Sequence, residues 1–428
     1  MGRTRRKRNQ KKTRHFHACD NTKEAILLNS WLVKQGKGRN KKLTLAVFDD
    51  TGRGVLTRKK IKAGEELINL PLNLTINVTS ILLDSNFCNV FLENTKQCLL
   101  DYRCSVSFQS LMAFYLSFLK VQGKNTKWHV YLDSLPKDYT VPYFLPNEIV
   151  NYIDPDIISV VSKQKATVQS SFQVFQDILG NNVSNDVSVV KLRKHFTLSL
   201  YEWAYFTVNT RCVYMDLTNL IDLKSQNSLL NIISDNTKIS LCPYLDMINH
   251  SPNAKNETKL NNFNSFSQVF ICYGDSHNLK LITEYGFYLP NNHLDYVSFN
   301  FDCIKDFLNN THSKLSQEQI SFINNHGLNK ALYIDNKGLS FSFYALLMVV
   351  KYYYDQNTDV NKLIYSAAIC SDNSVLRQLI LPMVKEKMFN YKELISNLET
   401  NCKQCVVLNN CVEYMSHQVK MLEKFIKC

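Results

Sequence analysis

Residues 241–289 carry the most informative pattern in the chain, LCPYLDMINHSPNAKNETKLNNFNSFSQVFICYGDSHNLKLITEYGFYL. An apolar run ends in Asn249-His250-Ser251, and the proline that follows predicts a turn. Apart from Cys272, residues 269–273 are β-branched or aromatic. The run stops at a glycine and predicts a strand. Tyr273 and Tyr285 each precede a glycine, which lets other backbone approach the two phenols closely. The stretch indicates a site that holds both phenols, and the alternative is a core of ordinary tyrosines.

The composition is that of a globular protein, with 428 residues, 45% hydrophobic and 20% charged. This length allows two or three domains. We expect no secretory signal and no membrane segment, so the thirteen scattered cysteines are interpreted as reduced thiols. Cys402 and Cys405 form one CxxC pair without a second, which is too few ligands for structural zinc. We therefore expect no metal.

Residues 3–14 contain eight of the Lys and Arg side chains behind the net charge of +13, and no acid. Such a run cannot bury enough apolar surface to order itself, so it predicts a disordered tail. It favours a nuclear-import signal read by an importin, or a nucleic-acid contact, over a tail that merely solubilises. We expect the protein in the nucleus and the cytoplasm.

Along the rest of the chain, hydrophobic spacing predicts helices and short strands. Residues 43–48 predict a strand, a Gly52-Arg53-Gly54 loop follows, and residues 61–68 predict a turn into another strand. Predicted helices cover 24–35, 108–121, 128–139, 157–179, 189–210, 314–332, 340–354, 359–368, 374–389 and 391–425. No strand is predicted after residue 292. The polar stretch 221–239 predicts a mobile loop. Arg211 is interpreted as a surface charge or as the anchor of a carboxylate.

In this order, the Gly-Arg-Gly, Asn-Thr-Arg, Asn-His-Ser, Tyr-Gly and Tyr-Gly-Phe pieces resemble SET-domain methyltransferases of the Rubisco large-subunit methyltransferase type. The similarity extends to the SET domain-containing protein 4 group and is strong over 51–71, 128–139 and 241–289. It implies an α+β fold, a SET domain of small β-sheets with a pseudoknot, carrying a helical insertion, plus an all-α C-terminal substrate-binding domain. The implied divisions are a basic tail at 1–22, a SET domain at 23–290 with its insertion at about 80–220, and a helical domain at 291–428.

The resemblance also implies a cofactor, S-adenosyl-L-methionine, and a channel through which a substrate lysine reaches it. It assigns Gly52, Arg53, Gly54, Asn249, His250 and Phe287 to the cofactor, Tyr273 and Tyr285 to catalysis, and Arg211 and Tyr214 to the channel. Methyl transfer needs a neutral amine, and deprotonating a free lysine at pH 7 costs about 4–5 kcal/mol. A dry aromatic channel lowers that cost.

The resemblance thus implies a monomeric protein-lysine N-methyltransferase acting on a protein substrate, with histone tails as candidates. Two alternatives stay open: a SET-like binding module without turnover, and a protein-histidine methyltransferase. Two departures from the family pattern bear on them. The segment 252–268 is shorter than the pattern, and Ser267-Gln268 stands where an acidic residue is expected.

Overall fold

The computed structural model describes residues 16–35, 41–62, 64–91, 101–218, 228–254, 268–311, 314–365, 374–403 and 405–427. The chain forms two compact units: Met1–Tyr139 with Lys163–Asp275, and Thr140–Ser162 with Ser276–Cys428. The compact units therefore divide at residue 275, whereas the sequence-based division between domains, at residue 290, stays a prediction. The basic run 3–14 lies outside the described residues, as does most of the shortened segment 252–268.

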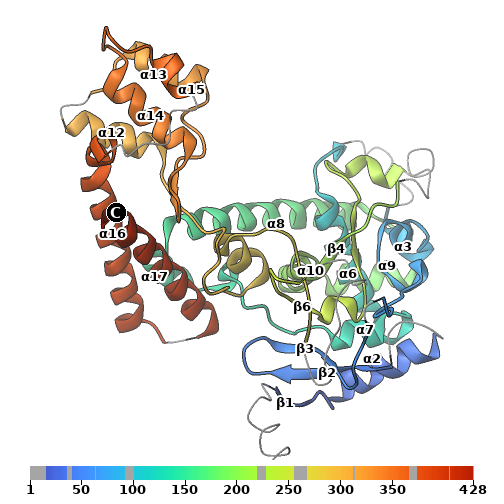
Figure 1. Ribbon diagram of the computed structural model, residues 1–428. Coiled ribbons are helices and arrows are strands. Elements are labelled where there is room, and N and C mark those ends of the chain that lie inside the picture. The colour runs from blue at the N-terminus through green and yellow to red at the C-terminus, as the bar shows by residue number, and fades with distance from the viewer. Residues whose placement is uncertain are drawn as a thin grey trace, which may run out of the picture. The chain divides into compact units, whose positions relative to one another are not determined.

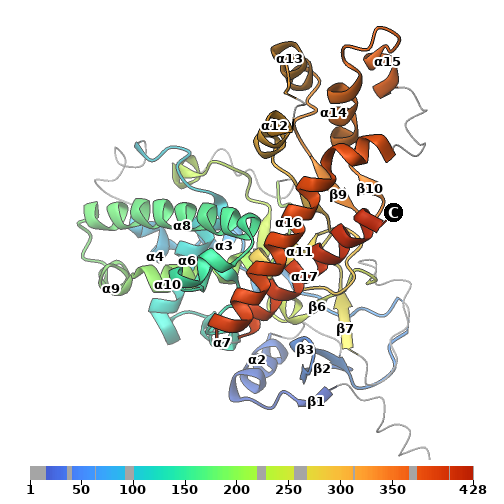
Figure 2. The ribbon, with the colours of Figure 1, turned by 90° about the vertical axis from the view of Figure 1, so that its left-hand side faces the viewer.

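The first unit contains a five-stranded sheet of order β1-β2-β3-β7-β6 (Figures 1 and 2). Its strands are β1 (Phe16–Cys19), β2 (Leu43–Phe48), β3 (Gly52–Thr57), β7 (Gln268–Ile271) and β6 (Asn249–His250). β3 pairs antiparallel with both β2 and β7, whereas β6 and β7 are parallel. The Gly-Arg-Gly piece was predicted as a loop. It is instead the start of β3, where Gly52 closes the β2–β3 turn with a φ of +67°.

Helices of the first unit are α2 (Lys23–Lys34), α3 (Val78–Leu82), α4 (Ser85–Cys88), α6 (Phe108–Gln122), α7 (His129–Ser134), α9 (Val187–His195) and α10 (Leu198–Arg211). The long helix α8 (Pro155–Asn181) extends over residues of both units. α6 is buried along almost its whole length, with Phe114 stacked on Phe175 at 4.2 Å between ring centroids. The predicted helix 189–210 is two helices, because Phe196 is extended and the Thr197 side chain caps α10.

A two-stranded sheet, β4 (Cys212–Tyr214) with β5 (Ile239–Leu241), follows α10 in the first unit. In the stretch 221–239 that was predicted as a mobile loop, Ser228–Ile232 form a 3-10 helix and β5 begins at Ile239. Residues 219–227 lie outside the described ones. No named strand is found in the described part of 61–68, where one was predicted. No helix in the described part of the chain is long and apolar enough to cross a membrane.

The second unit is mainly helical, with α12 (Phe301–Asn310), α13 (Gln317–Asn325), α14 (Phe341–Tyr352), α15 (Val360–Tyr365), α16 (Ser374–Asn401) and α17 (Val406–Lys427). α16 and α17 form a hairpin (Figure 1). The helix break lies between residues 401 and 406, not at 390 as predicted, and α12 was not predicted. The prediction of no strands is also wrong, because β8 (Val297–Ser298), β9 (Tyr333–Asp335) and β10 (Gly338–Leu339) form a small sheet.

Candidate active site

The junction of β3, β6 and β7 brings the predicted cofactor residues of the first unit together. The Asn249 side-chain amide donates to the carbonyl oxygens of Thr51 at 3.3 Å and Arg53 at 3.2 Å. The backbone of Gly54 lies close to the side-chain amides of Asn249 and Gln268. A Cβ there would lie 2.8 Å from Asn249 Nδ2 and 2.8 Å from Gln268 Nε2. A side chain at position 54 would therefore displace the Asn249 and Gln268 amides from their present positions.

His250 and Tyr273 form the next part of the site. The Tyr273 backbone N–H donates to His250 Nδ1 at 3.0 Å, and the two ring centroids are 5.1 Å apart. Since Nδ1 accepts, the proton of the neutral ring is on Nε2. Burial lowers the pKa of His250, so the ring is neutral at physiological pH. An uncharged imidazole therefore lies beside the predicted catalytic phenol.

The Tyr273 hydroxyl donates to the carbonyl oxygen of Ile248 at 2.7 Å. A core tyrosine would make the same kind of contact, so the bond alone does not separate the two interpretations of Tyr273. A phenol oxygen also carries two acceptor lone pairs. Donation to Ile248 is therefore compatible with accepting a hydrogen bond from a substrate nitrogen.

The Arg53 side chain has a structural partner on each side. Its Nε lies 2.7 Å from Asp20 Oδ2, and one guanidinium N–H donates to the carbonyl oxygen of Ser134 at 2.8 Å. Burial acts to raise the pKa of Asp20, but hydrogen bonds from Thr22 and the Arg53 guanidinium outweigh it and lower that pKa. A cofactor role for Arg53 would therefore rest on its backbone.

Arg211 anchors a carboxylate, one of the two interpretations that its position allowed. It donates to the carbonyl oxygen of Asp246 at 3.0 Å and to the Asp246 carboxylate at 3.2 Å. The Tyr131 hydroxyl donates to the same carboxylate at 3.0 Å. Burial acts to lower the pKa of Arg211, but the Asp246 carboxylate raises it, so the guanidinium stays charged. The pair ties the end of α10 to the loop that leads into Asn249.

Tyr214, the other predicted channel residue, is 71% exposed on β4. Its hydroxyl donates to Asp216 at 3.4 Å. The ring is thus largely exposed, and its role in a channel stays a prediction.

Tyr285 and Phe287 lie in the second unit, with ring centroids 6.3 Å apart. Tyr285 ends a π-helical turn, Leu281–Tyr285, and Gly286 follows with a φ of +78°. A Cβ on Gly286 would lie 2.7 Å from the carbonyl oxygen of Thr140, so this glycine is also required for close approach. Its own carbonyl oxygen accepts from Thr140 Oγ1 at 3.1 Å and Asn410 Nδ2 at 3.0 Å. The Tyr-Gly-Phe backbone is therefore fixed from two sides.

Sequence reasoning missed several partners of these residues. Ile248 contributes its backbone carbonyl oxygen, and a pattern of side chains cannot predict a backbone contact. Asp246 and Tyr131 are 115 residues apart and are joined only by the fold. Gln268 stands where an acidic residue was expected, and its amide donates to Thr51 Oγ1 at 2.8 Å.

The first-unit residues suit S-adenosylmethionine. Gly52 has open space where a Cβ would stand, which leaves the backbone of the β2–β3 turn accessible. The Asn249 amide binds the carbonyl oxygens on either side of Gly52, and the adjacent His250 and Tyr273 supply aromatic faces, which can stabilise a sulfonium without a counter-charge. In the described part of the chain, no group of three or more His, Cys, Asp and Glu side chains could hold a metal ion.

Comparison with known proteins identifies relatives over most of the chain. SET domain-containing protein 4 of Artemia parthenogenetica is 25% identical over 92% of this chain and 95% of its own length. The Homo sapiens protein of that name is 28% identical over 73% of this chain and 68% of its own length. An actin-histidine N-methyltransferase of Drosophila melanogaster is 25% identical over 63% of this chain and 50% of its own length. No protein-family model matches.

Solved structures establish the fold. Rubisco LSMT bound to AdoMet has a TM-score of 0.57 at 14% identity, and the complex with sinefungin and monomethyllysine has a TM-score of 0.59 at 16% identity. Each match covers 95% of this chain and 91% of the other. The α+β SET fold with a helical C-terminal region is confirmed, and so is the resemblance to the SET domain-containing protein 4 group.

Proposed function

We propose that this S-adenosylmethionine-dependent SET-domain methyltransferase acts on the ε-amino group of lysine in a protein substrate. The observation that carries the proposal is the Tyr273 phenol, fixed at a strand end by Ile248 and placed beside the neutral His250 ring. S-adenosylmethionine, when bound, supplies an electrophilic methyl group. The protein has to hold a neutral amine in line with it, which is mainly a task of positioning.

Two features of the chain serve that task. The phenol oxygen of Tyr273 accepts a hydrogen bond from the substrate nitrogen and so orients it. The nitrogen lone pair is then free to point at the methyl group. The aromatic rings of Tyr273 and His250 exclude water, which disfavours the ammonium form and lowers the pKa of the substrate lysine. The resemblance assigns a second phenol, Tyr285 of the Tyr-Gly-Phe segment, the role of limiting how many methyl groups are added.

The second candidate is histidine methylation, favoured by the similarity to an actin-histidine N-methyltransferase. The two substrates differ in the pH at which they become nucleophilic. A lysine needs deprotonation from a pKa near 10.4, whereas a histidine is mostly neutral above about pH 7. The kcat/KM of lysine methylation, which refers to the free substrate, should therefore rise between pH 7 and 9, and that of histidine methylation should stay flat.

The experiment that tests the proposal uses the full chain, labelled S-adenosylmethionine and peptide arrays that include histone tails. Each peptide is paired with versions in which lysine is replaced by arginine, or histidine by glutamine, and the products are mapped by mass spectrometry. Label lost with the lysine and rising with pH supports lysine transfer. Label lost with the histidine overturns it in favour of the second candidate. Cofactor binding without any label supports a binding module without turnover.

A further inference from the structure

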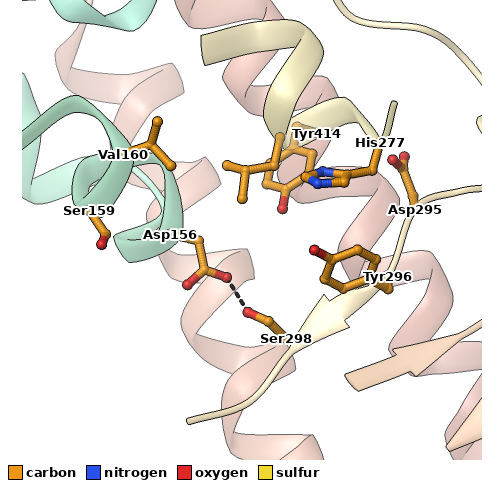
Figure 3. A pocket seen from close by; sticks show the side chains of 9 residues that line it. Asp156, Ser159, Val160, His277, Asp295, Tyr296, Ser298 and Tyr414 are labelled. Atoms are coloured by element: carbon orange, nitrogen blue, oxygen red, sulfur yellow. Dashed lines mark hydrogen bonds between the residues drawn. The ribbon is translucent and has the colours of Figure 1, made fainter. Parts of the chain in front are cut away.

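A cavity of about 200 Å³ lies in the second unit, apart from the residues assigned above (Figure 3). Its polar lining comes from Asp156 and Ser159 on α8, His277 just before α11 (Asn278–Lys280), Asp295 and Tyr296 just before β8, Ser298 on β8, and Tyr414 on α17. We propose that this cavity binds a basic side chain of the protein substrate, the guanidinium of an arginine or the ammonium of a second lysine. The proposal rests on the proposed function, because it names a further determinant of the same substrate.

The charge of the cavity is negative. Asp156 projects towards it, and the Ser298 hydroxyl donates to one of its carboxylate oxygens (Figure 3). Asp295 adds a second carboxylate, which is buried and accepts from the Asn278 backbone N–H and side-chain amide at 2.6 Å each. His417 Nδ1 lies 2.9 Å from the same carboxylate. Asp295 is thus held by internal partners, and Asp156 is the carboxylate left to meet a ligand.

Two phenols add acceptors to the cavity. Tyr414 is only 4% exposed, yet its hydroxyl points into the space and meets no hydrogen-bond partner within the described residues (Figure 3). Tyr296 also directs its hydroxyl there, with its ring 5.1 Å from that of His277. Burial, together with Asp156 and Asp295, raises the pKa of both phenols, which therefore stay neutral. The Tyr414 hydroxyl faces the cavity, so it can accept a hydrogen bond from a ligand donor there.

His277 completes the lining as an uncharged ring. Burial lowers its pKa against the opposing effect of Asp295, so it adds no positive charge at neutral pH. The lining as a whole offers a carboxylate, phenol oxygens and aromatic faces, which together suit a cation with several N–H donors. An anion would meet two carboxylates. The volume corresponds to about six or seven waters, enough for the end of a lysine or arginine side chain.

A short helical segment separates His277, at the cavity, from Tyr285. His277 caps the short helix α11 (Asn278–Lys280), which continues as the π-turn Leu281–Tyr285. Eight helical residues span about 12 Å at ~1.5 Å per residue. An extended peptide covers that length in about three or four residues. We therefore expect the basic side chain three or four residues from the methylated lysine.

The binding test uses the full chain and acetyl-arginine methylamide, with acetyl-citrulline methylamide as the uncharged isostere, in ligand-detected NMR titrations. Arginine should bind at least tenfold more tightly than citrulline. Asp156→Asn should weaken arginine binding about tenfold or more, and Tyr414→Phe should weaken it less. Asp306→Asn, an exposed carboxylate on α12, is the matched control and should change nothing. Equal binding of the two probes, or full arginine affinity in folded Asp156→Asn, overturns the proposal.

A kinetic test separates this proposal from the proposed function. Peptides with one target lysine carry a single arginine moved from five residues before it to five after it. The expected result is a lower KM with unchanged kcat when the arginine is three or four residues away, and loss of that benefit in Asp156→Asn. Methyl transfer without any positional effect sinks the cavity proposal alone. Arginine binding that depends on Asp156, without methyl transfer, sinks the proposed function alone.

Discussion

The Tyr273 hydroxyl donates a hydrogen bond to the Ile248 carbonyl oxygen, 2.7 Å away. Because the Tyr273 backbone N–H also donates to His250, the residue is held at both its backbone and its side chain by the segment around Asn249. This segment carries the residues predicted to contact the cofactor. The phenol is thus fixed relative to the cofactor side of the site, which is the requirement for catalysis by positioning.

Tyr273→Phe should lower the rate of methyl transfer about 100-fold or more, because it removes the orienting hydroxyl. It should also cost roughly 1 kcal/mol of stability, because Ile248 loses a hydrogen-bond partner. The measurement is a single-turnover assay, with cofactor affinity and thermal midpoint recorded beside it. A rate equal to that of the wild type would falsify the catalytic assignment. Tyr285→Phe, run as the comparison, should keep activity and allow further methyl groups to be added.

Gly54 and Gly52 form a matched pair for the cofactor site. In Gly54→Ala the new Cβ meets Asn249 Nδ2 and Gln268 Nε2 at 2.8 Å, so Asn249 must move. Affinity for S-adenosylmethionine should fall at least about tenfold, ~1.4 kcal/mol. Gly52→Ala meets nothing within 4 Å but has a φ of +67°, so it should cost roughly 1–2 kcal/mol of stability and retain binding. Cofactor titrations followed by thermal unfolding measure both effects. Equal affinity in the two variants would contradict this account.

Sequence patterns predicted the parts of the fold that are long and locally specified. β2 and α6 have the predicted type and nearly the predicted ends, because each is a long apolar run that the core buries on nearly all sides. The helix break at Phe196 was missed, because only the capping side chain of Thr197 marks it. The strands β8 to β10 were missed because two or three residues are too short to show alternation. α16 continues through residue 390 to residue 401, so the predicted break at 390 was misplaced.

Only those residues of the candidate site that belong to short sequence motifs were predicted. Asn249, His250 and Tyr273 occur in one ordered stretch, and the structure brings them together. The Arg211–Asp246–Tyr131 cluster escaped prediction, because its members are joined by packing between distant segments. Spacing in the sequence carries no information on such contacts. Their energetic importance follows from burial, which only the fold reveals.

Replacing Arg211 by methionine should destabilise the protein by about 3–5 kcal/mol, because it leaves the fully buried Asp246 carboxylate without its counter-charge. The exposed ion pair Lys238–Asp216 in the same unit is the control, and Lys238→Met should cause little measurable change. Urea unfolding of both variants makes the comparison. If the two variants unfold alike, the Arg211 pair does not hold the loop before Asn249.

The basic run 3–14 is proposed to direct import into the nucleus. Deleting it should leave methyl transfer to a short peptide unchanged and shift a fluorescently tagged protein towards the cytoplasm. A truncated protein that stays nuclear would rule out import as its function. Weaker nucleosome binding with a shallower salt dependence would instead indicate a direct contact with nucleic acid.

Asp154 should make the stability of the protein depend on pH. It immediately precedes α8, and its Oδ1 accepts from the Asp156 backbone N–H at 2.7 Å. Burial, and next the Asp156 charge, raise the pKa of Asp154 to about 6, although Lys387 and Tyr391 oppose the shift. The folded state therefore binds a proton that the unfolded state has already released.

This difference in proton binding sets the direction in which the free energy of unfolding changes with pH. Below about pH 4 both states are protonated and Asp154 costs nothing. As the pH rises from about 4 to 6, only the unfolded state gains from ionisation, so the free energy of unfolding falls, by at most about 3 kcal/mol, and then stays constant. Asp154→Asn keeps the helix cap and removes the titration. Urea unfolding between pH 4 and 7 should show that the free energy of unfolding of the variant rises relative to that of the wild type as the pH rises. A constant difference between the two at every pH would mean that Asp154 titrates normally in the folded protein.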